Sequence, residues 1–198
     1  MACTAADETP AVLVLGDSLS AGYGLDISEG WVTLLKNKLA EEGYGHDVVN
    51  ASISGDTTSG GRSRLKKALT RHAPALVIIE LGGNDGLRGQ PVRAMRRNLE
   101  AMIKDSRAAG AQVALLGMRI PPNYGERYAN AFHAVYGDLA ETHDLPLVTF
   151  FLEGVALDKA LMQADGIHPN AKAQPILLDN AWPVVTEGLR AWCDAVTS

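Results

Sequence analysis

Short unbroken runs of apolar residues recur along the chain and alternate with segments whose apolar residues are spaced as on one face of a helix. Runs without polar alternation are typical of strands that are buried on both faces of a sheet. The predicted strands are residues 11–15, 47–51, 75–81 and 112–116, with 146–151 as a fifth candidate, and the helical spacing covers residues 31–39, 65–69, 95–103, 128–139 and 173–196. This alternation predicts parallel strands with right-handed crossovers, and therefore a three-layer α/β domain. Within the last helical segment, Pro183 is expected to bend or break the helix.

The composition is that of one globular domain. A chain of 198 residues that is 46% hydrophobic and 21% charged can bury a substantial core. We expect a disordered leader over residues 1–10 and a single domain over 11–198. The net charge of -5 gives no basic field for nucleic acid, and the short basic cluster at 62–67 is typical of a solvated helix face. No run approaches the ~20 apolar residues that a membrane-spanning helix needs.

The two cysteines indicate neither a disulfide framework nor a zinc site. Cys193 lies in the last helical segment, where we expect a small, partly buried residue. Cys3 lies in the leader, and the sequence leaves open whether Ala2-Cys3 is the remnant of a lipoprotein cleavage site.

Small, polar loops follow the first three predicted strands, at residues 16–20 (Gly-Asp-Ser-Leu-Ser), 53–57 and 82–85. In parallel α/β sheets the site forms at the carboxyl ends of the strands, where the strand order reverses. If the order is 2-1-3-4-5, the reversal lies between the first and third strands. Ser18 and Asn84 then share one crevice, and the loop after the second strand flanks them.

A nucleophilic serine requires a base, and His168 is the histidine that stands in a loop with a carboxylate close by. Asp165 precedes it by three residues, so that one turn can hold the carboxylate against the imidazole and direct the other ring nitrogen to Ser18. Gly166 and Pro169 favour such a turn. For the other histidines a structural role is the better interpretation: His46, His72, His133 and His143.

Acyl transfer also requires hydrogen-bond donors for the oxyanion of the tetrahedral intermediate. The candidates are the Ser18 backbone N–H, the Gly55 backbone N–H and the Asn84 side-chain amide. Each motif alone could be an ordinary turn or helix cap. Their joint appearance at the ends of successive strands is what predicts a serine hydrolase. The histidines and carboxylates show no metal-ligand pattern, so no metal is expected.

Two loops place apolar residues near the predicted crevice. Leu87 follows Asn84, and Ile120, Pro121 and Tyr124 follow the fourth strand. Apolar walls suit an acyl chain or an aromatic ester better than a sugar. The alternative is that these four residues only pack their own loops.

With these motifs the sequence resembles the SGNH (GDSL) hydrolase superfamily, most closely its branch of multifunctional esterases, arylesterases, thioesterases and lysophospholipases. The four family blocks fall on residues 16–20, on Gly55 within 52–57, on 82–85 and on 165–169. The resemblance implies a flavodoxin-like α/β/α sandwich with a five-stranded parallel sheet of order 2-1-3-4-5. It also implies that Ser18 is the nucleophile, that His168 is the base with Asp165, and that Ser18, Gly55 and Asn84 supply the oxyanion donors. No metal or organic cofactor is implied, and the expected location is the periplasm or outside the cell.

We therefore expect a serine esterase that hydrolyses acyl or aryl esters, and also acyl thioesters or lysophospholipids, through an acyl-enzyme. The G-x-S-x-G elbow of α/β-hydrolases would need glycine where Ser20 stands, and no dinucleotide or P-loop motif follows the first strand. Two other functions share these features, because fold does not fix function. One is a non-catalytic binding module. The other is a carbohydrate acetyl esterase or acyltransferase, which would differ in the shape of its pocket.

Overall fold

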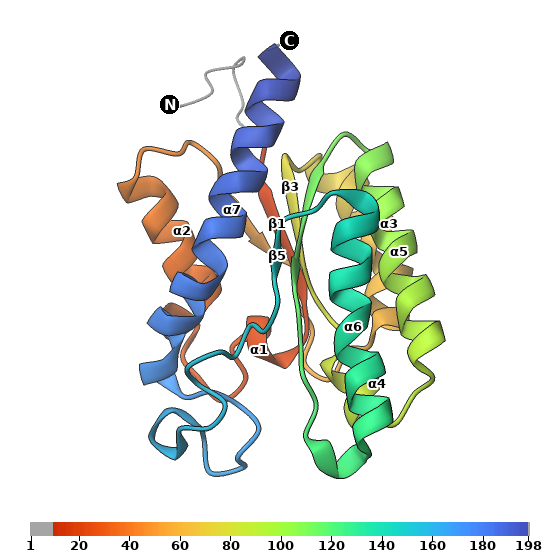
Figure 1. Cartoon of the computed structure of the whole chain (residues 1–198). Coiled ribbons are helices and arrows are strands. Elements are labelled where there is room, and N and C mark those ends of the chain that lie inside the picture. The colour runs from red at the N-terminus through yellow and green to blue at the C-terminus, as the bar shows by residue number, and fades with distance from the viewer. Residues whose placement is uncertain (1–9, 198) are drawn as a thin grey trace.

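The computed structural model describes residues 10–197, which form a five-stranded parallel sheet between two layers of helices (Figure 1). The strand order β2-β1-β3-β4-β5 confirms the predicted 2-1-3-4-5 topology. The strands are β1 (Val12–Gly16), β2 (Val48–Asn50), β3 (Leu76–Glu80), β4 (Gln112–Leu116) and β5 (Leu147–Val148). The helices are α1 (Ser18–Ala21), α2 (Trp31–Glu41), α3 (Thr58–His72), α4 (Gly83–Leu87), α5 (Val92–Ala108), α6 (Glu126–His143) and α7 (Gln174–Thr197), with 3-10 turns η1 (Ile27–Glu29), η2 (Pro122–Tyr124), η3 (Lys159–Leu161) and η4 (Ala171–Ala173). Except for Pro10, the predicted leader lies outside the described residues, and so does Cys3.

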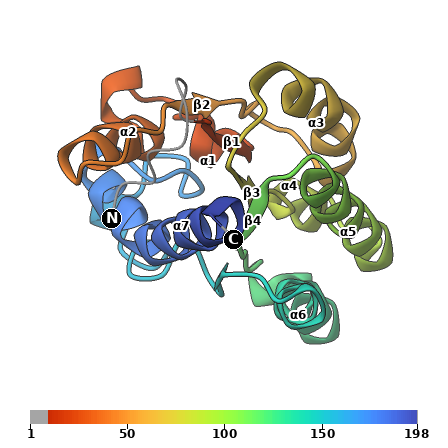
Figure 2. The ribbon, with the colours of Figure 1, turned by 90° about the horizontal axis from the view of Figure 1, so that it is seen from above.

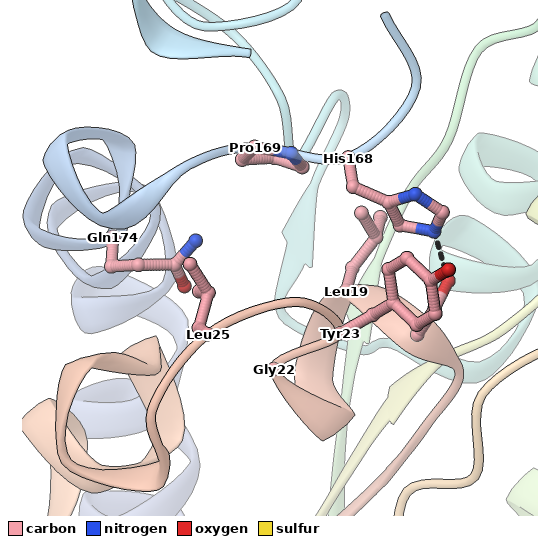
Figure 3. A pocket seen from close by; sticks show the side chains of 8 residues that line it. Leu19, Gly22, Tyr23, Leu25, His168, Pro169 and Gln174 are labelled. Carbon is pink, nitrogen blue, oxygen red and sulfur yellow. Dashed lines mark hydrogen bonds between the residues drawn. The ribbon is translucent and has the colours of Figure 1, made fainter. Parts of the chain in front are cut away.

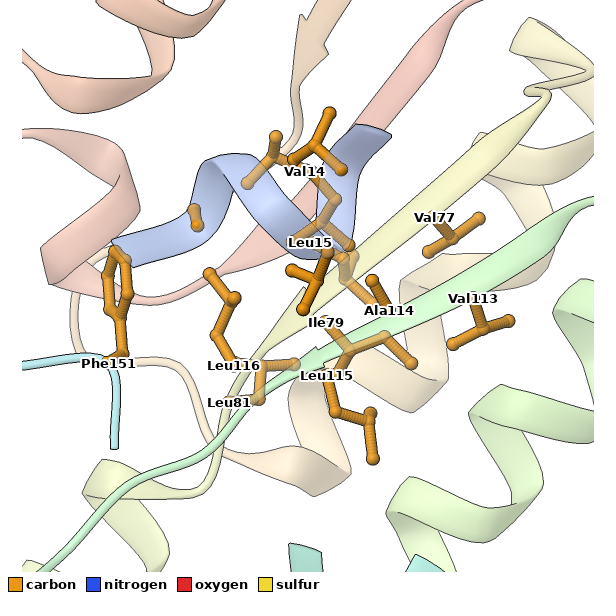
Figure 4. Close-up of a cluster of buried hydrophobic side chains, with 14 of the residues drawn as sticks. Val14, Leu15, Val77, Ile79, Leu81, Val113, Ala114, Leu115, Leu116 and Phe151 are labelled. Atoms are coloured by element: carbon orange, nitrogen blue, oxygen red, sulfur yellow. The ribbon is translucent and has the colours of Figure 1, made fainter. Parts of the chain in front are cut away.

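Helices α2 and α7 cover one face of the sheet, and α3, α5 and α6 cover the other (Figures 1 and 2). This arrangement explains the unbroken apolar runs, because both faces of the central strands are enclosed. Every residue of β1 and β3 is buried. Side chains such as Leu15, Ile79 and Leu115 pack together in the core (Figure 4).

Two predicted elements need correction. The fifth strand was expected over residues 146–151 but is only the two-residue edge strand β5. The backbone stops pairing with β4 as a strand after Val148. Phe151 is buried by packing against the Trp31 ring, with 5.2 Å between the ring centroids. The second correction concerns Pro183, which was expected to bend or break the helix: the break does not occur, because α7 continues through Pro183 as one helix. The Thr186 hydroxyl donates to the carbonyl groups of Trp182 and Pro183 in this turn.

The loops at the carboxyl ends of the strands meet at one edge of the sheet, at the bottom of Figure 1. There α1 follows β1 at once, α3 begins after the loop from β2, and α4 follows β3. These three short connections hold the first three sequence motifs. In the part of the chain that the structure describes, no helix is long and apolar enough to cross a membrane.

Candidate active site

Ser18 is the first residue of α1, a helix of a single turn. The Asp17 side chain caps this helix by accepting the Leu19 N–H at 3.1 Å. Gly22 ends it in the left-handed conformation, with φ of 73°, which glycine adopts without a Cβ clash. Because Ser18 occupies the first helical position, its own N–H has no acceptor within the helix. The Ser18 hydroxyl and N–H therefore both lie at the N-terminal end of α1, next to the carboxyl end of β1.

Ser18, His168 and Asp165 are joined by two hydrogen bonds. The Ser18 hydroxyl lies 2.9 Å from His168 Nε2, the contact marked by the dashed line in Figure 3. His168 Nδ1–H donates to Asp165 Oδ2 at 2.7 Å. The other oxygen of Asp165 accepts the backbone N–H groups of Ile167 and His168, at 2.9 and 3.0 Å. The turn predicted from the three-residue spacing thus fixes both the carboxylate and the imidazole.

These hydrogen bonds hold the pKa of Asp165 low. The backbone N–H of His168, its side chain and the backbone N–H of Ile167 lower this pKa to about 2. Each of these bonds favours the charged form of the carboxyl group. Asp165 is therefore an anion at neutral pH, and it fixes the proton of the imidazole on Nδ1.

A small pocket lies beside the serine and histidine (Figure 3). The Tyr23 ring packs on the His168 ring with 4.5 Å between their centroids. Gln174 is buried at the start of α7, where its side chain accepts the Trp31 N–H. The pocket is lined by Ser18, Leu19, Gly22, Tyr23, Leu25, His168, Pro169 and Gln174.

The sequence reasoning missed Tyr23, Leu25 and Gln174 as lining residues. A sequence signal existed for Tyr23, since it follows Ser18 by five residues within the same loop region. Gln174 lies 156 positions after Ser18 (174 − 18), and only the folded sheet brings it near.

The predicted oxyanion donors lie in the segments that directly follow β1, β2 and β3: Ser18 in α1, Gly55 in a loop and Asn84 in α4. Gly55 has φ of 79°, and its carbonyl group accepts a hydrogen bond from Arg88 at 2.9 Å. Asn84 lies in α4, and its side-chain amide donates to Asp17 Oδ2 at 3.0 Å. Asp17 therefore contacts both the helix that begins with Ser18 and the amide of Asn84.

The loop that carries Gly55 is held by Arg64 of α3. Its guanidinium group pairs with Asp56 at 2.8 Å and also donates to the carbonyl groups of Ala51 and Gly16. Gly16 belongs to β1 and Asp56 to the loop after β2. Arg64 thus ties the Gly55 loop to the strand that leads into Ser18.

The four predicted substrate-binding residues differ in their exposure. Leu87 and Tyr124 are each 38% exposed, and the Tyr124 hydroxyl donates to the Leu87 carbonyl group at 3.1 Å. Pro121 is exposed. Ile120 is buried, and its side chain lies so close to Gly86 that a Cβ there would be 2.5 Å away. Ile120 therefore packs beneath the loop, whereas Leu87 and Tyr124 form an exposed apolar edge.

The remaining histidines contact groups away from Ser18. His133 lies 3.3 Å from the Met118 carbonyl oxygen, and His143 lies 3.6 Å from a Glu100 carboxylate oxygen. His46 contacts the Pro10 carbonyl group, and His72 lies in the last turn of α3. Among residues 10–197, no group of three or more histidine, cysteine or acidic side chains is arranged to hold a metal ion.

A serine hydroxyl, an imidazole and a carboxylate in this hydrogen-bonded order, on a doubly wound α/β sheet, are the arrangement of a serine hydrolase. The chain matches the GDSL-like lipase/acylhydrolase family over residues 14–175 and belongs to it. The resemblance drawn from the sequence motifs is thereby confirmed.

Individual relatives are similar over most of their length. Esterase TesA of Pseudomonas aeruginosa is 57% identical over 88% of this chain and 87% of its own. Thioesterase 1/protease 1/lysophospholipase L1 of Escherichia coli K12 is 48% identical over 85% of this chain and 79% of its own. The crystal structure of the psychrotrophic esterase EstA from Pseudoalteromonas, inhibited by monoethylphosphonate, has a TM-score of 0.87 and 44% identity over 92% of this chain and all of that one. The predicted class, a carboxylic ester hydrolase, is confirmed by this family and these relatives.

Proposed function

We propose that this enzyme hydrolyses acyl and aryl esters through an acyl-enzyme formed on Ser18, with His168 as the base and Asp165 as its partner. The observation that supports this proposal is the continuous hydrogen-bonded chain from the Ser18 hydroxyl through His168 to Asp165. Inhibition of the related esterase EstA by a phosphonate is consistent with an activated serine.

In the first half-reaction the Ser18 oxygen attacks the ester carbonyl carbon while His168 Nε2 takes the hydroxyl proton. Asp165 stabilises the imidazolium that forms. His168 then returns the proton to the leaving alcohol or thiol, and the acyl group remains on Ser18. In the second half-reaction His168 takes a proton from water while the water oxygen attacks the acyl carbon. His168 then gives this proton to the Ser18 oxygen as the acyl bond breaks, and the carboxylic acid is released.

The negative charge on the tetrahedral intermediate is stabilised by the N–H groups of Ser18 and Gly55 and by the amide of Asn84. Asp17 accepts a hydrogen bond from this amide, so the amide is oriented before the substrate arrives. An amide nitrogen carries two hydrogens, and the second remains available for the oxyanion.

Replacing Asn84 by alanine tests this role. We expect Asn84→Ala to lower kcat by about 10²- to 10³-fold, because one oxyanion donor contributes roughly that factor, while KM changes much less. Steady-state kinetics with a p-nitrophenyl ester measure both constants. Asn37→Ala, which removes an exposed amide on α2, is the matched control and should leave both constants unchanged. An Asn84→Ala enzyme with the wild-type kcat would remove Asn84 from the oxyanion site.

The substrate class follows from the apolar residues around the serine. Tyr23 and Leu25 line the pocket, and Leu87 and Tyr124 expose apolar surface on the neighbouring loops. These side chains favour an acyl chain or an aromatic group over a sugar. Acyl thioesters and lysophospholipids are included in the proposal, since the related E. coli enzyme is named for both activities.

A panel of p-nitrophenyl esters, acyl-CoA thioesters and lysophospholipids of graded chain length tests the proposed substrates. The expected result is a kcat/KM that rises with acyl length beyond acetyl. A preference for acetylated sugars would instead indicate the carbohydrate acetyl esterase. The absence of turnover and of serine labelling would indicate a binding module. Cell fractionation tests the expected periplasmic or secreted location.

Activity is expected to be independent of metal ions, because the serine, imidazole and carboxylate complete the proposed chemistry by themselves. Incubation with EDTA should leave kcat and KM unchanged. Inactivation by EDTA that an added divalent ion reverses would contradict this prediction. Dialysed enzyme without chelator is the control for losses during handling.

A further inference from the structure

Glu80 is a fully buried acidic residue at the end of β3, directly behind the turn that carries Ser18. Its Oε2 accepts the Ser20 hydroxyl at 2.7 Å and the Asp17 N–H at 3.3 Å. Its Oε1 has no hydrogen-bond partner within residues 10–197. Acidic side chains are rarely buried to this extent, because the loss of hydration is costly. A role in the local structure is therefore expected for this carboxyl group.

Glu80 helps to hold the Gly16–Asp17 peptide group, which lies one peptide group before the one that carries the Ser18 N–H. The N–H of this Gly16–Asp17 peptide donates to Glu80. Its carbonyl group, on Gly16, accepts the Ile53 N–H at 3.1 Å and Arg64 Nη2 at 3.2 Å. The peptide is thus held by β3 on one side and by the β2 loop and α3 on the other. This peptide group leads through Asp17, the N-cap of α1, into Ser18, the first residue of the helix.

The space around the Glu80 carboxyl group is filled without room for another side chain. A Cβ atom at Gly16 would lie 2.7 Å from Glu80 Oε2 and 2.7 Å from the Ser20 hydroxyl oxygen. Residue 16 lies opposite Glu80 in the parallel ladder. Glycine at this position therefore lets the Glu80 carboxyl group reach the α1 backbone and the Ser20 side chain.

Burial also favours the protonated form of the Glu80 carboxyl group. Loss of hydration raises its pKa well above the usual range, and the neighbouring Asp17 carboxyl group raises it further. Asp17 itself has a pKa raised to about 6, chiefly by burial. The buried Tyr136 also lies near Glu80, since the Glu80 carboxyl group is among the causes that raise the pKa of this tyrosine. Both effects favour the protonated form of the Glu80 carboxyl group, which accepts hydrogen bonds without adding a second negative charge beside Asp17.

We propose that Glu80 is a positioning residue for the nucleophile, whose buried carboxyl group fixes the Asp17 peptide and the Ser20 side chain and so aligns Ser18 with His168. This proposal rests on the function assigned to Ser18. Alignment matters because a displacement of about 1 Å can lower a rate by about 10²-fold. A carboxamide has a similar shape and keeps one carbonyl oxygen as acceptor, whereas a leucine side chain keeps none.

Three variants test the proposal: Glu80→Gln, Glu80→Leu and Ser20→Ala. We measure the rate of fluorophosphonate labelling, kcat, KM and the pH profile of each. Glu80→Leu should lower kcat and the labelling rate by about 10- to 100-fold with little change in KM. Glu80→Gln should retain at least a third of the wild-type rates and the wild-type pH profile. Ser20→Ala should lower the labelling rate by about threefold or more. Ser106→Ala, a buried polar substitution on α5, controls for general effects of core mutation.

The proposal is overturned if Glu80→Leu folds and labels at the wild-type rate, or if Glu80→Gln is as slow as Glu80→Leu, which would mean that an ionised carboxylate is needed. Thermal unfolding shows whether each variant is folded. If Glu80→Leu does not fold, Ser20→Ala decides, and its labelling at the wild-type rate overturns the proposal. A failure of the proposed function is distinguishable, because wild-type enzyme would then not be labelled on Ser18 at all.

Discussion

Ser18→Ala is expected to abolish covalent labelling by a fluorophosphonate and to lower kcat by roughly 10⁶-fold. The substitution removes the atom that forms the acyl-enzyme, while the neighbouring hydrogen bonds of Asp17 remain available. Residual hydrolysis above the rate in water is expected, since oxyanion donors still stabilise attack by water. Burst kinetics with a p-nitrophenyl ester and mass spectrometry of the labelled protein measure both effects.

The control for this experiment is Ser63→Ala, which removes a hydroxyl from α3 that donates to the Gly60 carbonyl group. This variant should be labelled like the wild type. Thermal unfolding should show that both variants remain folded. If Ser18→Ala is still labelled at the wild-type rate, another residue is the nucleophile and the proposed mechanism is wrong.

Much of the fold could be predicted because each central strand coincides with a short continuous run of apolar residues. Strand β4 begins and ends where the apolar run 112–116 does, and β1, β2 and β3 differ from the predicted bounds by one residue at each end. Edge strand β5 was predicted too long because Phe151 is buried by side-chain packing rather than by the ladder. A hydrophobic residue in the sequence indicates burial, but it does not show whether the residue is buried in a paired strand or by side-chain packing outside the sheet.

The proximity of Ser18, His168 and Asp165 could also be predicted, since each lies in a short polar motif with a recognisable spacing. The contacts that support these three residues could not be predicted from the sequence. Asp17 and Asn84 are 67 residues apart, and Asp17 and Glu80 are 63 apart. Such contacts depend on strand register and on the depth of burial, and neither is written in a local pattern. The acceptor role of Glu80 is visible only once β3 lies beside β1.

The pH dependence of kcat/KM tests the roles of the ionising groups near Ser18, because each group is expected to change this rate constant differently as pH rises. His168 must be neutral to accept the serine proton, so kcat/KM should rise as the base loses its proton. Asp165 contributes no such limb, since its pKa is lowered to about 2 and it is already an anion. Asp17 has a pKa raised to about 6, and its ionisation adds negative charge beside Asn84. That charge opposes the developing oxyanion, so it lowers the rate as pH rises.

We therefore expect His168→Ala to remove the rising limb and to lower kcat by roughly 10⁶-fold, because the base itself is lost. Asp165→Asn should lower kcat by roughly 10⁴-fold, since the carboxamide holds the imidazole in a poorer tautomer while KM changes less. Asp17→Asn is the control for the neighbouring ionisation and should keep the rising limb. The order of the first two losses is the decisive measurement. If Asp165→Asn retains the wild-type kcat, another group orients His168. If Asp17→Asn abolishes the rising limb of the pH profile, this limb was wrongly assigned to His168.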